Sequence, residues 1–477
     1  MEQLPDDVLL EVMRCLTVKD LFACRLVCKA LGALALHPDV WRYRSFNADE
    51  DDNDNQLWQP VLRLAPCLGA LYATLPPPVW GCLLVCTMTR CAVQKLSLTV
   101  YEGGCMHTAA MIRNQEGLGR LRLLKVAIKF HRNISKDESE DATALLGTVA
   151  STSCLEQLEV YFNFQTPPCS ASTKAMLVQH GAMTTSSLRS FICPWFARSD
   201  HGFANFVLGT HAATLEDIDL GLGTKSSAYS SETAPLLAGT PNLRKLRCPL
   251  LPGLEALVAC ESLTVLTVNV CDIPERRALV GAASLLRRAH QLHQVKLYYG
   301  SSLYEDSSLV DLGVDLIRAL ASSGRSQLES LTVIMAPGGL GSRDKCSTLV
   351  TPLMAALPSL PALRHLAVDP APMALLLEVT PQTTPALQGV ELHPLREERL
   401  PCAHAWLHTD AVRELFSNNF SLKLFVPSVP KYCRKKPKCE VCALGCHLPD
   451  WKDVQLEEFS FLHGASCITI PPNKFCN

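Results

Sequence analysis

The sequence predicts an α/β protein in which a short helical module at the amino terminus precedes a long solenoid with a curved parallel sheet and outer helices. Two observations lead to this prediction. Apolar residues between Leu4 and Trp41 recur at helical spacing, and from residue 93 onward one short apolar pattern returns about every 29 residues. A chain of 477 residues also exceeds one ordinary compact core, which favours several domains or a repeat array.

The composition indicates a folded protein without a chain-wide charge. Apolar residues make up 48% and charged residues 19% of the chain, and 44 basic against 46 acidic side chains give a net charge of -2. This balance offers no general attraction to nucleic acid or to an anionic membrane. The 22 cysteines are spread along the chain, and neither a signal peptide nor an apolar stretch of about 18 residues is found. We therefore expect a soluble protein with reduced thiols in the cytoplasm or nucleus, without a membrane partner.

The first 45 residues predict three short helices. Pro5 suits the first position of a helix whose apolar residues are Val8, Leu9, Val12, Met13 and Leu16. Thr17 or Asp20 can cap a second helix, with Leu21, Cys24, Leu26, Val27, Leu31 and Leu34 around its circumference. A third segment holds Val40 and Trp41. Such a small core supplies only ~3 to 5 kcal/mol, so a partner surface is expected.

The spacing of these residues resembles an F-box. The matching positions are Leu4-Pro5-Asp6-Asp7-Val8-Leu9-Leu10-Glu11-Val12, Leu16, Asp20-Leu21, Val27-Cys28-Lys29 and Trp41. The resemblance implies a three-helix module that binds the Skp adaptor of a cullin-RING (SCF) ubiquitin ligase, mainly through Leu4, Pro5, Leu9, Val27 and Trp41. Ala30-Leu31 stands where the family often has an aromatic residue, which implies a slightly weaker or rearranged interface. A generic helical cap is the alternative.

The domain boundaries follow from changes in composition. The acidic run after Phe46 would repel itself and stay solvated, as a linker does. We expect a helical module over residues 1–47, an acidic linker over 48–60, a solenoid over 61–426 and a cysteine-rich tail over 427–477.

The repeat consists of an apolar residue, two variable positions, a second apolar residue, one variable position and a third apolar residue. It starts at Val93, Leu121, Leu155, Leu188, Leu215, Leu243, Leu263, Leu292, Leu328, Leu363 and Leu387. Helical stripes such as Leu279, Ala282, Ala283 and Leu286 lie between starts, so each unit predicts one strand and one helix. A single match would also fit a buried strand of a doubly wound domain. The series resembles the leucine-rich repeats of F-box proteins, which implies that the solenoid holds the protein to be ubiquitinated.

The residues that alternate with the repeat leucines should face the open surface of the sheet. The predicted partner-binding residues are Glu159, Tyr161, Asp217, Asp219, Lys245, Arg247, Lys296 and Tyr298. Their mixed charge and their tyrosines are typical of protein recognition. The alternative is that they are merely solvated sheet positions.

The carboxy-terminal tail is rich in cysteine and histidine. Cys439-x-x-Cys442 has a spacing at which two thiolates share one zinc ion, and Cys446 with either His447 or Cys433 could complete a tetrahedron. The alternative, which we favour, is a tail with free thiols and no cofactor. The spacings do not form a RING.

No catalytic motif appears. Gly221-Leu-Gly-Thr-Lys-Ser lacks the first glycine of a phosphate-binding loop, and no nucleophile elbow, zinc-protease helix or kinase motif is found. The resemblance to F-box proteins therefore implies a non-enzymatic substrate receptor of an SCF-type ubiquitin ligase, with a cullin-RING core and a protein substrate as partners, and we expect no nucleic acid as a partner. The alternatives are a repeat scaffold outside the ubiquitin system and a zinc-assisted nucleic-acid binder.

Overall fold

The computed structural model describes residues 4–48, 57–75, 89–130, 136–163, 186–194, 202–221, 231–270, 276–299, 307–322, 327–335, 343–394, 405, 409–419, 422–425 and 469–470. The chain divides into two compact units, residues 1–223 with 239–243 and residues 224–238 with 244–477. Among the described residues, every helix is too short or too polar to span a bilayer.

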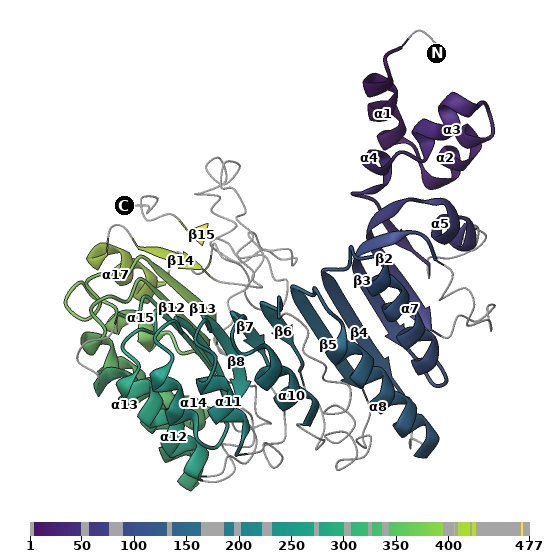
Figure 1. Ribbon diagram of the computed structural model, residues 1–477. Helices are drawn as coiled ribbons and strands as arrows, with labels where there is room; N and C mark the ends of the chain where they lie inside the picture. Colours follow the sequence, from purple (N-terminus) through teal and green to yellow (C-terminus); the bar gives the residue numbers. More distant parts are fainter. Residues whose placement is uncertain are drawn as a thin grey trace. The chain divides into compact units, whose positions relative to one another are not determined.

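The amino-terminal module contains four short helices (Figure 1): α1 (Asp6–Cys15), α2 (Val18–Arg25), α3 (Lys29–Ala35) and α4 (Pro38–Trp41). The prediction of one second helix is wrong, because α2 ends at Arg25 and α3 begins again at Lys29. Thr17 caps α2 by accepting from the amide of Asp20 at 3.2 Å, and the sulfur of Cys28 accepts from the amide of Leu31 at 3.4 Å to cap α3. The apolar pattern runs through this break, so periodicity alone does not reveal it.

The rest of the first unit alternates strands and helices (Figure 1). Its strands are β1 (Ser45–Asn47), β2 (Cys67–Leu75), β3 (Ala92–Val100), β4 (Leu123–Lys129), β5 (Gln157–Asn163), β6 (Ser190–Ile192) and β7 (Asp217–Asp219). Its further helices are α5 (Trp58–Leu64), α7 (Cys105–Gly117), α8 (Lys136–Ser151) and α10 (Gly202–His211). Strands β1 to β7 pair in chain order, and every pair is parallel. Helix α5 covers residues 58–60 of the predicted linker.

The second unit repeats the same plan. Its strands are β8 (Lys245–Pro249), β9 (Val265–Val270), β10 (Gln294–Tyr299), β11 (Ser330–Met335), β12 (His365–Ala371), β13 (Gly389–Pro394), β14 (Lys423–Phe425) and β15 (Thr469–Ile470). Its helical elements are α11 (Thr233–Ala238), η1 (Leu254–Ala259), α12 (Arg276–Arg288), α13 (Ser307–Ser322), α14 (Arg343–Ala356), η3 (Leu357–Ser359), α15 (Ala374–Glu378) and α17 (Asp410–Asn418). Strands β8 to β14 are parallel in chain order, whereas β15 is antiparallel to β14.

The eleven predicted repeat starts correspond one by one to strands β3 to β13. Most strands begin two residues after the first apolar position, as β5 does after Leu155 and β9 after Leu263. All eleven starting residues are buried, because each fills the core between the sheet and the helices beside it. Both units therefore have the predicted leucine-rich-repeat architecture. Strands β1, β2, β14 and β15 are not among the predicted starts.

The helical module is hydrogen-bonded to the edge of the first sheet. Strand β1 pairs with β2, and the amides of Gly69 and Ala70 both donate to the carbonyl oxygen of Arg44, at 2.9 and 3.1 Å. A Cβ atom at residue 69 would lie 3.0 Å from the Arg42 carbonyl oxygen and 3.2 Å from that of Arg44. A glycine therefore lets the backbone segment from Arg42 to Arg44 approach β2 this closely.

Candidate interaction surfaces

The helical module exposes several large apolar side chains. Of the ten large apolar residues that are exposed in the described part of the chain, six lie in this module: Leu4, Val8, Val12, Leu26, Val27 and Tyr43. The most exposed are Tyr43 at 83%, Leu26 at 81% and Val27 at 70%. Single exposed apolar residues are ordinary, but six within about 40 residues are characteristic of a binding surface.

The local backbone explains why these side chains are exposed. Leu26 and Val27 occupy the break between α2 and α3, where their amides donate to the carbonyl oxygens of Ala23 and Cys24. Val8 and Val12 lie one turn apart on α1, so they share one face of that helix. Leu9 and Met13, displaced by one residue, are the buried residues of the same helix. Helix α1 thus has two apolar faces, and only one of them is buried within the described part of the chain.

The core of the module centres on Trp41. Its side chain is fully buried, its indole nitrogen donates to the Ala35 carbonyl oxygen at 2.7 Å, and its ring packs against Phe22 at 5.8 Å between centroids. Arg44 adds contacts to α1, because its Nη2 donates to the carbonyl oxygens of Met13 and Arg14, both at 2.8 Å. Burial lowers the pKa of this guanidinium.

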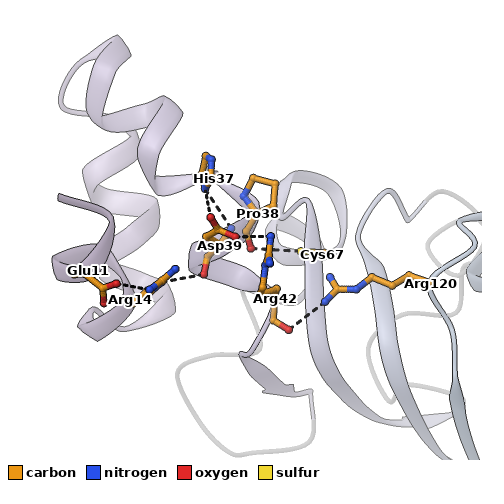
Figure 2. A network of polar contacts seen from close by, with 8 residues as sticks. All are labelled: Glu11, Arg14, His37, Pro38, Asp39, Arg42, Cys67 and Arg120. Carbon is orange, nitrogen blue, oxygen red and sulfur yellow. Dashed lines mark hydrogen bonds and ion pairs between the residues drawn. The ribbon is translucent and has the colours of Figure 1, made fainter. Parts of the chain in front are cut away.

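A polar network continues from α1 to the first repeats (Figure 2). Arg14 pairs with Glu11 and its Nε donates to the Asp39 carbonyl oxygen at 3.3 Å, while the Asp39 carboxylate pairs with Arg42. Arg120, in the loop after α7, donates through Nη2 to the Arg42 carbonyl oxygen at 3.2 Å. The network therefore links α1 and α4 to the loop between α7 and β4 within the first unit.

The predicted sheet residues of the first unit lie on its open face, as the alternation predicts. Glu159 and Tyr161 on β5 alternate with buried Leu158, Val160 and Phe162. Asp217 and Asp219 flank buried Ile218 on β7, and the Asp219 carboxylate accepts from the amide of Gly221 at 2.7 Å.

Glu159 and Tyr161 are part of one polar cluster with Lys125 of β4. The Glu159 carboxylate accepts from the Tyr161 hydroxyl at 3.1 Å, from Gln157 Nε2 at 2.7 Å, and pairs with Lys125 Nζ at 3.4 Å. The Lys125 ammonium also lies 4.8 Å from the centroid of the Tyr161 ring. Burial and then the Glu159 carboxylate raise the pKa of Tyr161 to about 12.

The predicted sheet residues of the second unit also alternate with the core. Lys245 and Arg247 lie on β8 beside buried Leu246, and Lys296 and Tyr298 lie on β10 beside buried Leu297. Burial lowers the pKa of Lys296, and the nearby positive charge of Arg247 lowers it further, while Glu391 opposes the shift. Lys296 and Arg247 are therefore close enough to interact electrostatically.

The predicted zinc ligands Cys439, Cys442, Cys446 and His447 lie outside the described residues. Within the residues that the structure does describe, no group of three or more histidine, cysteine, aspartate or glutamate side chains is arranged to hold a metal ion.

Comparisons with known proteins bear on the helical module. A family model described as F-box-like matches residues 1–47. These residues are an F-box-like domain. A search of curated proteins finds no match. Among solved structures, an internalin (inlF) from Listeria monocytogenes is similar at 12% sequence identity, covering 73% of this chain and 86% of its own, with a TM-score of 0.31. The repeat architecture is shown by this chain's own strands and helices.

The F-box-like domain separates the predicted adaptor-binding residues into two groups. Leu4, Pro5 and Val27 are exposed and can meet a partner. Leu9 is only 8% exposed and Trp41 is not exposed, so both side chains belong to the domain core, and their contact with the adaptor stays a prediction. A sequence pattern does not separate these roles, because a core and an interface both require apolar side chains.

Some surface residues were not predicted. Leu26 and Tyr43 are the most exposed apolar side chains of the F-box-like domain, whereas the apolar pattern predicts that Leu26 lies within a continuous helix. On the sheet, Lys125 joins the predicted pair Glu159 and Tyr161. Register could have revealed Lys125, because it lies beside Glu159 when consecutive repeats are aligned.

Proposed function

We propose that this chain is the substrate-recognition subunit of an SCF-type ubiquitin ligase. In this proposal the F-box-like domain binds the Skp adaptor and thereby a cullin-RING core, and the leucine-rich repeats bind the protein to be ubiquitinated. The supporting observation is the concentration of exposed apolar residues in the domain at residues 1–47. Burying one such leucine or valine side chain stabilises a complex by ~1.5 to 3 kcal/mol before the costs of association.

No residue of this chain needs to touch the bond that forms in this proposal. The adaptor and the substrate are held on one chain, so the substrate's local concentration near the ubiquitin-loaded enzyme rises. Strand β1 pairs with β2, so backbone hydrogen bonds hold the F-box-like domain against the first sheet.

The test is affinity purification of the full chain and of a Leu26→Asp, Val27→Asp double variant, followed by mass spectrometry. We expect the Skp adaptor and a cullin with the unchanged chain, and their loss by tenfold or more with the variant, because two carboxylates would be buried at the interface. Both altered positions are exposed, so the domain should remain folded.

The matched control is Val280→Asp, which changes an exposed valine on α12 of the second unit. It should retain the adaptor. If the unchanged chain brings down no adaptor, the domain does not act as an F-box and the repeat scaffold outside the ubiquitin system is the better description. Equal retention by the double variant would show that these two residues are not the docking surface.

A further inference from the structure

The open face of strands β2 to β5 in the first unit combines two tyrosines with three lysines. The side chains that point away from the core fall into register across these strands: Tyr72, Ser97, Lys125 and Glu159 lie side by side, and Thr74, Thr99, Ala127 and Tyr161 form the next row. The tyrosines lie at the two outer strands. Between them lie the small side chains of Ser97, Thr99 and Ala127, together with Lys125.

Two lysines on this face are held over aromatic rings. The Lys95 ammonium lies 5.9 Å from the centroid of the Tyr72 ring, and that of Lys125 lies 4.8 Å from the Tyr161 ring. Such contacts restrict long side chains that otherwise lose considerable rotamer entropy on binding. The cations are therefore oriented before any partner arrives, which lowers the cost of association.

The carboxylate of Glu159 on this face already has hydrogen-bond and ion-pair partners within the chain. The side chain of Glu159 is 14% exposed, and its oxygens accept from Tyr161 and Gln157 and pair with Lys125. By contrast, Lys95 and Lys129 pair with no carboxylate in the described part of the chain, and neither is buried. Three lysines and one internally satisfied glutamate leave this face positively charged.

We propose that the face of β2 to β5 binds an acidic segment of a partner protein, with Lys95 and Lys129 meeting its carboxylates and Lys125 positioned between them by Glu159 and Tyr161. This inference rests on the proposed function, since it names the kind of protein that the repeats capture. Charge complementarity selects the occupant: a segment rich in aspartate and glutamate would neutralise the lysines, whereas a basic segment would be repelled. Tyr72 and Tyr161 supply apolar contact area at its two sides.

The test measures binding of a fluorescent glutamate-rich peptide to the purified full chain by anisotropy, at low and at physiological salt. We expect binding that weakens as salt rises, and a loss of about tenfold or more in a Lys95→Glu, Lys129→Glu variant, because each reversal places like charges together. A Lys95→Gln, Lys129→Gln variant should lose less. Arg63→Glu, an exposed change on α5 of the same unit, is the control and should bind as the unchanged chain does.

Four outcomes would overturn the inference: no binding of the glutamate-rich peptide by the unchanged chain, equal peptide binding by the reversed variant while it remains folded by circular dichroism, equal binding of a lysine-rich peptide, or preferential binding of a single-stranded oligonucleotide. Capture of the Skp adaptor is measured on the same samples. If the adaptor binds and the peptide does not, only the acidic-segment inference fails; if the peptide binds and the adaptor does not, the ligase proposal fails.

Discussion

Tyr161 shows how one side chain on an open sheet face acquires an unusual environment. It donates its hydroxyl to Glu159 on its own strand and carries the Lys125 ammonium over its ring. The alternation of residues along β5 predicted that Glu159 and Tyr161 share a face. It did not predict Lys125, since that contact depends on the register between two strands that are separated by a helix.

The pKa of Tyr161 gives a prediction at the residue scale. Burial and Glu159 raise it from 10.0 to about 12, so the folded protein favours the protonated phenol. The contribution of this group to stability is therefore complete below about pH 10 and is lost as the pH rises toward 12. A tyrosinate absorbance titration of the unchanged chain minus that of Tyr161→Phe should show one group ionising near 12. In Glu159→Gln the midpoint should fall, though not fully to 10, because burial remains the larger cause. Ionisation of Tyr161 near pH 10 in the unchanged chain would contradict this account.

At the scale of the element, α1 combines two apolar faces on one short helix. Leu9 is buried against the rest of the F-box-like domain, while its neighbour Val8 is 41% exposed. Sequence periodicity predicts the helix correctly, but it does not distinguish the buried Leu9 from the exposed Val8. The packing of Trp41 and Arg44 decides which face is inside, and those residues lie some 30 positions further along the chain.

Substitutions on the two faces of α1 should have different effects: one should lower the stability of the domain, and the other should weaken adaptor binding. Leu9→Ala should destabilise the domain by ~2 to 5 kcal/mol, because it leaves a cavity in a small core. Val8→Ala should change stability by about 0.5 kcal/mol or less, and should weaken adaptor capture instead. Amide hydrogen exchange of residues 6–41 in the full chain measures the first effect, and adaptor pull-down measures the second. Equal loss of protection in both variants would mean that α1 does not have the division of faces described here.

The break between α2 and α3 marks the limit of the sequence prediction for this domain. Leu21, Leu26, Val27 and Leu31 suggest one continuous apolar helix, yet only Leu21 of the four is buried. Cys28 caps α3 at this break, and cysteine is not among the residues preferred at that position. A cysteine cap inside a continuous apolar pattern therefore does not indicate from the sequence that a helix ends there.

At the scale of the whole molecule, the sequence predicts the repeats well because the leucine pattern of each repeat determines the register of its strand. A leucine pattern fixes which side chains enter the core, and a shift by one residue would expose all of them. β2 escaped prediction although Leu68 and Leu71 are fully buried, since Gly69 and Ala70 stand between the two leucines and the third apolar position is held by the small side chain of Ala73.

The repeat architecture predicts that a destabilising substitution lowers stability mainly in its own repeat and in the repeats beside it. Leu266 on β9 is fully buried, and Leu266→Ala should cost ~2 to 5 kcal/mol at that position. Because each repeat contacts mainly its neighbours, hydrogen exchange should speed up in β8, β9 and β10 and stay unchanged in α1 to α4. A uniform loss of protection along the chain would instead indicate a single cooperative core.

The pairing of β1 with β2 has a consequence for the solubility of the chain. Strand β2 is long, and without β1 its backbone donors and acceptors would face water along the edge that Ser45, Phe46 and Asn47 now cover. Open strand edges recruit other strands and lead to aggregation. The F-box-like domain therefore also serves as a protective end cap, and a protein shortened to begin after residue 48 should self-associate even though every repeat strand from β2 onward is retained.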